Sequence, residues 1–246
     1  SDVGANWIHV DAPAVLNLSQ FTFGQTKVLN DRLEVNRIDT GKTGSLTINL
    51  PGDAEWTLNP GGILSLLNTN AAATLLAGSD ANIEGGLMVI GDVRCEARID
   101  ITGTVNIGTE GQPFRLSGGN LFDLNTIEGG VIDGPGLLGA DDLAGLKGYG
   151  TIQTDIDFDN ISELIANGGL LDVNGEILDI GTLRSDGTAA VLDLANPFDT
   201  GLSENGIALL NGGQIQGALI TLNSFDLRGN GTVRNRVINN DEIRAG

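Results

Sequence analysis

Three aspartates at alternate positions are the most pronounced candidate for chemistry in this chain of 246 residues. Asp155, Asp157 and Asp159 stand at positions i, i+2 and i+4, so they share one face of a strand or surround an ion in a loop. Ca²⁺ prefers oxygen ligands, and three carboxylates on one strand repel each other unless a cation lies near them. The sequence therefore raises the hypothesis of a calcium site at these residues.

An ordinary strand is the competing interpretation of this segment, and it is the one we favour. Ile156 and Phe158 would then be buried, while the three aspartates face the solvent. An EF-hand loop would need Gly at its sixth position and Glu at its twelfth, but the chain has Asn160 and Ala166 there. We therefore expect no required cofactor, with Ca²⁺ as the one candidate ion.

Catalytic residue combinations are hard to assemble from this sequence. His9 is the single histidine, and no G-x-S-x-G elbow occurs, so a nucleophile–histidine arrangement would have to use His9. Asp141 and Asp142 form a carboxylate pair, but no histidine or basic motif follows them. Two carboxylates are enough to hydrolyse a neutral glycoside, yet nothing selects two among the 32 acidic residues. We expect no enzymatic activity, and a polysaccharide-active enzyme is the least favoured alternative.

The charge of the chain argues against two classes of partner. The sequence contains 13 Lys and Arg against 32 Asp and Glu, which gives a net charge of −19. Nucleic acids and anionic membrane surfaces both attract basic protein surfaces. No apolar run approaches the roughly 20 residues that span a bilayer. We therefore expect neither nucleic-acid binding nor membrane insertion.

The ends of the chain and its cysteine bear on its location. Cys95 is the single cysteine, which excludes a disulfide within the chain and favours a buried thiol over a disulfide between two chains. The sequence starts at Ser1 without an initiator methionine or a signal peptide, as expected for a processed mature protein or a fragment. We expect a secreted, extracellular protein displayed on a cell surface.

Two distant segments repeat each other. Residues 129–134 (GGVIDG) resemble residues 212–217 (GGQIQG), and each segment is followed by a Gly-x-Gly-Thr motif, at 148–151 and 229–232. Internal repeats are typical of stacked architectures in which each unit contacts only its neighbours. The earlier copy continues into an apolar strand, whereas the later copy stops near Ile243. The sequence therefore raises the question of what covers the end of the stack.

Short strands separated by Gly, Asn and Asp fill the chain from about residue 38. Residues 45–50 (SLTINL) alternate cleanly between apolar and polar side chains. The 37 glycines and the low aromatic content of 4% favour a thin, repetitive core over a globular one. We predict an all-β parallel β-solenoid, or β-helix, in which each coil lies about 4.8 Å from the next. An antiparallel β-sandwich is the alternative fold.

Three segments depart from this pattern. Residues 1–36 contain few glycines and a large share of the aromatic side chains, so we assign them to an N-terminal arm or cap, and residues 37–246 to the solenoid domain. Residues 137–146 and 159–166 have apolar side chains at helical spacing, and Asp159 could cap a short helix. Neither candidate helix is long enough to change the fold class.

The repeats resemble those of bacterial surface β-helix proteins. The matching residues are 148–152 (GYGTI), 165–170 (IANGGL) and 229–246, and the resemblance extends over roughly residues 80–246. Such repeats occur in autotransporter passengers and in adhesins of the filamentous-haemagglutinin type. The resemblance implies an elongated extracellular protein with a structural or adhesive role.

The unfinished repeat suggests a function. The end of a solenoid exposes backbone groups and core side chains, so it must be capped or will pair with another chain. We expect the N-terminal arm of one subunit to contact the C-terminal coil of the next, giving a head-to-tail homopolymer in the form of a surface filament. The interface residues that we predict are Val3, Trp7, Ile8, Val10, Val233, Val237, Ile238 and Ile243.

A surface adhesin is the alternative function. In this case the side of a monomeric solenoid would bind cell-surface glycans or a host protein, and the ends would be covered. Fold class alone does not separate the two functions, because one architecture serves many roles.

Overall fold

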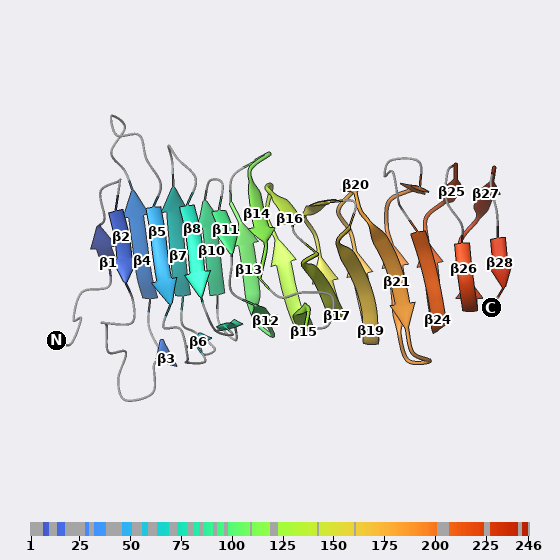
Figure 1. The fold of residues 1–246 in the computed structure, drawn as a ribbon, viewed down its shortest axis with the longest axis horizontal. Helices are drawn as coiled ribbons and strands as arrows, with labels where there is room; N and C mark the ends of the chain where they lie inside the picture. Colours follow the sequence, from blue (N-terminus) through green and yellow to red (C-terminus); the bar gives the residue numbers. More distant parts are fainter. Residues whose placement is uncertain are drawn as a thin grey trace.

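The structure, a computed structural model, is a parallel β-solenoid (Figure 1). It describes the strands between residues 7 and 95, with side chains at Leu87, Val89, Arg94 and Cys95. It then describes residues 98–108, 110–118, 123–141, 143–159, 161–200, 207–223, 227–240 and 243–245, with the backbone only for 207–209. This part of the chain forms 28 strands and no α-helix. It therefore contains no helix that is long and apolar enough to cross a membrane.

Each coil of the solenoid has three faces. Strands pair in parallel with strands of the coils before and after, and one coil closes in about 20 residues. Face 1 contains β3 (Val28–Leu29), β6 (Trp56–Leu58), β9 (Ala81–Ile83), β12 (Ile99–Ile101), the first parts of β15 (Asn125–Asp133), β17 (Gly145–Ile152), β19 (Glu163–Val173), β24 (Ile207–Gly217) and β26 (Leu227–Val233), and also β21 (Thr182–Asp186) and β28 (Ile243–Ala245). Face 2 contains β1 (Trp7–His9), β4 (Arg32–Arg37), β7 (Ile63–Asn68), β10 (Gly86–Ile90), β13 (Thr104–Ile107), the second parts of β15, β17, β19, β24 and β26, and β22 (Val191–Leu194).

Face 3 is interrupted, whereas faces 1 and 2 are continuous. An eight-stranded sheet contains β2 (Ala14–Asn17), β5 (Leu46–Leu50), β8 (Ala73–Ala77), β11 (Val93–Cys95), β14 (Pro113–Leu116), β16 (Leu137–Ala140), β18 (Asp155–Phe158) and β20 (Ile177–Asp179). A separate three-stranded sheet contains β23 (Phe198–Asp199), β25 (Ile220–Leu222) and β27 (Val237–Asn239). The predicted parallel β-solenoid is confirmed, and the antiparallel sandwich is wrong.

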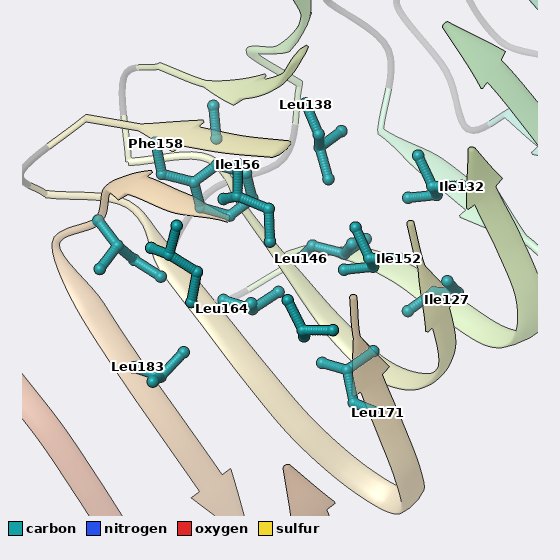
Figure 2. Close-up of a cluster of buried hydrophobic side chains, with 14 of the residues drawn as sticks. Ile127, Ile132, Leu138, Leu146, Ile152, Ile156, Phe158, Leu164, Leu171 and Leu183 are labelled. Carbon is teal, nitrogen blue, oxygen red and sulfur yellow. The ribbon is translucent and has the colours of Figure 1, made fainter. Parts of the chain in front are cut away.

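Inward-pointing side chains from the three faces form one apolar core, part of which is drawn in Figure 2. In β13, Val105 and Ile107 are buried while the residues beside them are not, as the two-residue period of a strand requires. On face 3 the strand register places Leu116, Ala140 and Phe158 in one buried column. The small Ala140 thus lies between two large side chains, which keeps the core filled along the stack.

A buried amide side chain joins consecutive coils. Asn125 is fully buried, and its Oδ1 accepts a hydrogen bond from the backbone N–H of Ile99 at 2.9 Å. Its Nδ2 donates to the carbonyl oxygens of Gly118 at 3.0 Å and Gly145 at 2.9 Å. Because Ile99 lies one coil before Asn125 and Gly145 lies one coil after, this side chain fixes the position of three coils relative to each other.

The repeated Gly-x-Gly motifs occupy equivalent corners between face 1 and face 2. A Cβ atom at Gly148 would lie 1.9 Å from the carbonyl oxygen of Ile127, and one at Gly229 would lie 1.9 Å from that of Leu210. Both glycines have positive φ, 140° and 106°. The repeat in the sequence therefore marks the corners where the backbone approaches the preceding coil most closely.

The strands of residues 1–36 lie in the same stack as the rest. β1 pairs in parallel with β4, and β2 pairs in parallel with β5. The expected boundary after residue 36 falls inside β4. The assignment of residues 1–36 to an arm or cap stays a prediction.

Both expected helices are wrong. Residues 137–140 form β16, which pairs with β14 and β18, and the following segment enters β17. Asp159 does accept a hydrogen bond from the backbone N–H of Ile161 at 3.2 Å, as a helix cap would, but the chain enters β19 at Glu163. Strand pairing on both sides satisfies the backbone of these segments, and this outweighs the local helical spacing.

Substitution of the corner glycines tests the importance of this close approach. An alanine with positive φ costs roughly 1–2 kcal/mol relative to glycine. Gly148→Ala should lower the free energy of unfolding by more than this, because the new methyl group also collides with the carbonyl of Ile127. Gly187→Ala is the matched control, since Gly187 has a φ of 97° but no atom within 4 Å of the new Cβ. Urea unfolding measures both variants, and equal losses would contradict the steric argument.

Candidate functional site

A groove of about 570 Å³ lies on face 1. Outward-pointing side chains of β15, β17, β19 and β21 line it, and residues before β12 and β15 form part of its border. The lining residues are Arg98, Asp123, Leu124, Thr126, Glu128, Lys147, Gly148, Tyr149, Glu163, Ile165, Asn167, Gly168 and Arg184. The groove therefore extends over five successive coils, from the coil of β12 to that of β21.

The strand register explains the floor of this groove. Thr126, Lys147, Ile165 and Arg184 occupy the same outward position in four consecutive coils. Although it points outward, Ile165 is only 2% exposed, because it is covered by its longer neighbours. A short hydroxyl side chain and a covered apolar side chain thus alternate with two long basic ones.

Arg98 forms one border of the groove and is held by acidic residues. Its Nη1 lies 2.8 Å from Oδ2 of Asp100, and its Nε lies 2.9 Å from Oδ1 of Asp123. Thr126 donates from Oγ1 to the other oxygen of Asp100 at 2.5 Å. These contacts connect two coils and fix the border of the groove.

Arg184 forms the other border, within a second charged cluster. Its Nη2 lies 3.1 Å from Oδ2 of Asp186, and its Nη1 lies 3.5 Å from Oε2 of Glu163. Asn211 donates to Oδ1 of Asp186 at 2.6 Å. Burial alone would raise the pKa of Asp186, but the hydrogen bonds from Arg184 and Asn211 and the charges of Arg184 and Lys147 together lower it.

Tyr149 stands at the corner between face 1 and face 2 and is 39% exposed. Its ring lies between glycines of the two neighbouring coils. A Cβ at Gly129 would be 3.7 Å from Cε2 of the ring, and one at Gly168 would be 3.7 Å from Cδ1. Because Gly129 and Gly168 carry no side chain against the ring, the ring remains accessible beside the groove.

Several polar groups of the groove have no partner among the described residues. Lys147, Glu128 and the Tyr149 hydroxyl form no hydrogen bond or ion pair with that part of the chain. Nε of Arg184 also has no acceptor, but it is buried and so is not accessible from the groove. The groove thus offers donors and an acceptor that the protein itself does not satisfy.

The three candidate calcium ligands lie on β18 and just after it. Ile156 and Phe158 are fully buried, and Asp155, Asp157 and Asp159 are half-buried on the outer side. Asp155 accepts a hydrogen bond from the backbone N–H of Glu176 at 2.8 Å. Among the described residues, these three included, no group of three acidic, His or Cys side chains is placed to hold a metal. Calcium binding here stays a prediction without geometric support.

The last coil presents a second candidate surface. Ile243 pairs with Leu227, which occupies an inward position and is buried, yet Ile243 is 52% exposed. Val233 and Val237 pair with the fully buried Ile215 and Ile220, and both are only partly buried. These three side chains, which we call the C-terminal core edge, therefore occupy core positions that no further described coil covers.

The other predicted interface residues lie elsewhere or are not described. Ile238 pairs with Thr221 on the outer side of face 3. Trp7 and Ile8 belong to β1, which pairs with β4, and only their backbone is described. Val3 and Val10 lie outside the described residues. The contact between the N-terminal arm and the last coil stays a prediction.

The structure also places three other residues that the sequence singled out. Cys95 is fully buried in the core, as predicted. Asp141 lies 3.4 Å from Nη1 of Arg115 and 3.9 Å from Nη1 of Arg94, so it joins the outer sides of coils. His9 lies in β1, where only the backbone is described.

Sequence reasoning missed the groove because its residues are far apart in the chain. Lys147 and Arg184 occupy outward positions of β17 and β21, but only the register shows that they share one column. A column of this kind can be found only by aligning every coil, and the coils differ in length at their corners.

Comparison with protein-family models, curated proteins and solved structures finds no match for this chain. The class of protein therefore follows from the fold itself, a parallel β-solenoid with three-faced coils. This architecture is compatible with β-helix repeat proteins.

Acid titration tests the Arg184–Asp186 cluster. Because the pKa of Asp186 in the folded state is below its ordinary value of 3.8, the charged pair stabilises the fold above that pH. The stabilisation is lost as the pH falls through the lowered pKa. Asp186→Asn should therefore lower the melting temperature slightly at pH 7, and the difference from the unaltered protein should shrink as the pH falls below 3.8.

Glu110→Gln is the control for this titration, since Glu110 is exposed and lies outside the cluster. Its melting temperature should follow that of the unaltered protein at each pH. A pH-independent difference between Asp186→Asn and the unaltered protein would show that ionisation of Asp186 does not stabilise the fold.

Proposed function

We propose that this chain is an extracellular structural protein whose solenoids stack end to end into a filament. The observation that carries the proposal is the exposure of Ile243, a side chain whose partner in the preceding coil, Leu227, is buried. Burial of such a side chain contributes roughly 1.5–3 kcal/mol, so a coil that covers it is favoured.

The backbone of the last coil supports the same proposal. β28 pairs with β26 on one side, and no described strand pairs with its other side. An exposed strand edge readily accepts another strand. The C-terminal core edge adds apolar contact to these backbone groups.

The direction of the strands makes a second copy a suitable partner. Because the strands pair in parallel along the whole stack, the first coil of a copy in the same orientation presents strands in the direction that β28 requires. Figure 1 places β1 and β28 at opposite ends of the molecule. Such a head-to-tail contact uses two different surfaces and does not close, so it gives a filament.

The proposal of an extracellular location rests on the sequence and not on the fold. The resemblance to autotransporter passengers and filamentous-haemagglutinin-type adhesins supports secretion and surface display, and the net charge of −19 suits a soluble surface. Stacking of coils involves no covalent step, and we propose no enzymatic activity. The adhesin alternative is supported by the groove on face 1, and a groove on the side does not compete with stacking at the ends.

Charge at the C-terminal core edge should prevent the assembly. Ile243→Lys should reduce association of purified protein at least tenfold, because a charge at a core position opposes coverage by another coil. Leu170→Lys is the matched control, since Leu170 is 49% exposed but lies on face 2 in the middle of the stack. Sedimentation velocity and negative-stain electron microscopy measure the assembly.

Two outcomes would overturn the proposal. If the unaltered protein stays monomeric at high concentration, the last coil is covered by the same polypeptide or is stable when exposed. If Ile243→Lys and Leu170→Lys assemble equally well, the contact does not use the C-terminal core edge.

A further inference from the structure

The groove on face 1 has the size and form of a ligand site. Its volume of about 570 Å³ lies within the range of roughly 300–1,000 Å³ that is typical of such sites. It extends over five coils, so at about 4.8 Å per coil it is roughly 19 Å long. A linear, extended ligand therefore fits it better than a compact one.

The charges that line the groove are balanced although the chain is strongly acidic. Arg98, Lys147 and Arg184 lie among Asp123, Glu128 and Glu163. An anionic polymer would meet three carboxylates in the groove and a net charge of −19 around it. A cationic polymer would be attracted by the net charge of −19 but would meet three basic side chains in the groove itself, so an uncharged ligand matches the balanced charges of the groove best.

The unsatisfied groups of the groove define what this ligand must offer. Lys147 needs acceptors, and Glu128 needs donors. A hydroxyl group both donates and accepts, so a ligand with many hydroxyl groups can satisfy both side chains.

Tyr149 supplies an apolar surface beside these polar groups. It is the chain's only tyrosine, and its ring is accessible because glycines flank it on both neighbouring coils. An aromatic ring next to a few convergent polar groups is the usual composition of a small-molecule site. The C–H faces of a sugar ring are apolar and can pack on such a ring.

We propose that the groove on face 1 binds an uncharged, linear oligosaccharide. One sugar ring packs against Tyr149, and hydroxyl groups accept hydrogen bonds from Lys147 and donate to Glu128. The site lies on the side of the solenoid, so the inference does not depend on stacking of the ends.

The experiment is a glycan array followed by titration calorimetry. The array carries neutral gluco-, manno- and galacto-oligosaccharides together with uronate-containing and sulfated ones, and the tightest neutral oligosaccharide is then titrated. Tyr149→Ala should weaken its binding about tenfold or more, because the packing surface is lost. Tyr149→Phe keeps the ring and should bind within about threefold of the unaltered protein.

A second variant and a control guard against misfolding. Lys147→Met keeps a long side chain without the ammonium group and should weaken binding several-fold. Leu178→Ala is the control. Leu178 is about as exposed as Tyr149 (42% against 39%), but it lies in β20 on face 3, so its replacement should leave binding unchanged. Thermal melts show whether each variant is folded.

The inference is overturned by any of three results. The first is that no neutral oligosaccharide binds, and the second is that only the acidic ones bind. The third is that folded Tyr149→Ala binds as tightly as the unaltered protein. The state of the ends is measured separately by sedimentation, so failure of stacking and failure of sugar binding are distinguishable.

Discussion

The structure depends on how closely the backbone of one coil approaches the coil before it at the corner between faces 1 and 2. At Gly148 the backbone lies so near the carbonyl of Ile127 that no Cβ atom fits, and Gly229 repeats this arrangement over Leu210. This approach keeps the corner narrow and lets one strand continue from face 1 to face 2. The register on both faces follows from it, and with the register come the buried columns and the outward columns.

The groove is a consequence of the same register. Thr126, Lys147, Ile165 and Arg184 come together because each coil repeats the position of the one before it. The length of the corner adds the aromatic side chain. Tyr149 alone lies between Gly148 and Gly150, whereas four residues, 167–170, lie between the equivalent positions of the next coil. Close packing and the candidate ligand site thus share one cause.

The sequence was informative where a rule depends on neighbouring residues. Alternation predicted the burial of Ile156 and Phe158 and the outward position of the aspartates between and beside them. The Gly-x-Gly repeat predicted a stacked architecture. Prediction failed at residues 137–146, where helical spacing is real but strand pairing with β14 and β18 decides the conformation. It also missed the groove, since the partners of Arg184 are set by coil length and not by local pattern.

The interruption of face 3 has a mechanical consequence. β20 ends the eight-stranded sheet and β23 begins a new one, so at this level only faces 1 and 2 carry backbone hydrogen bonds from coil to coil among the described strands. In a stack of this kind, backbone hydrogen bonds on all three faces resist bending. At this level the described strands of face 3 lack them. The stack should therefore bend most easily at this level, with face 3 opening and faces 1 and 2 staying paired. Under heat or tension the coils from β23 onward should separate as one cooperative block.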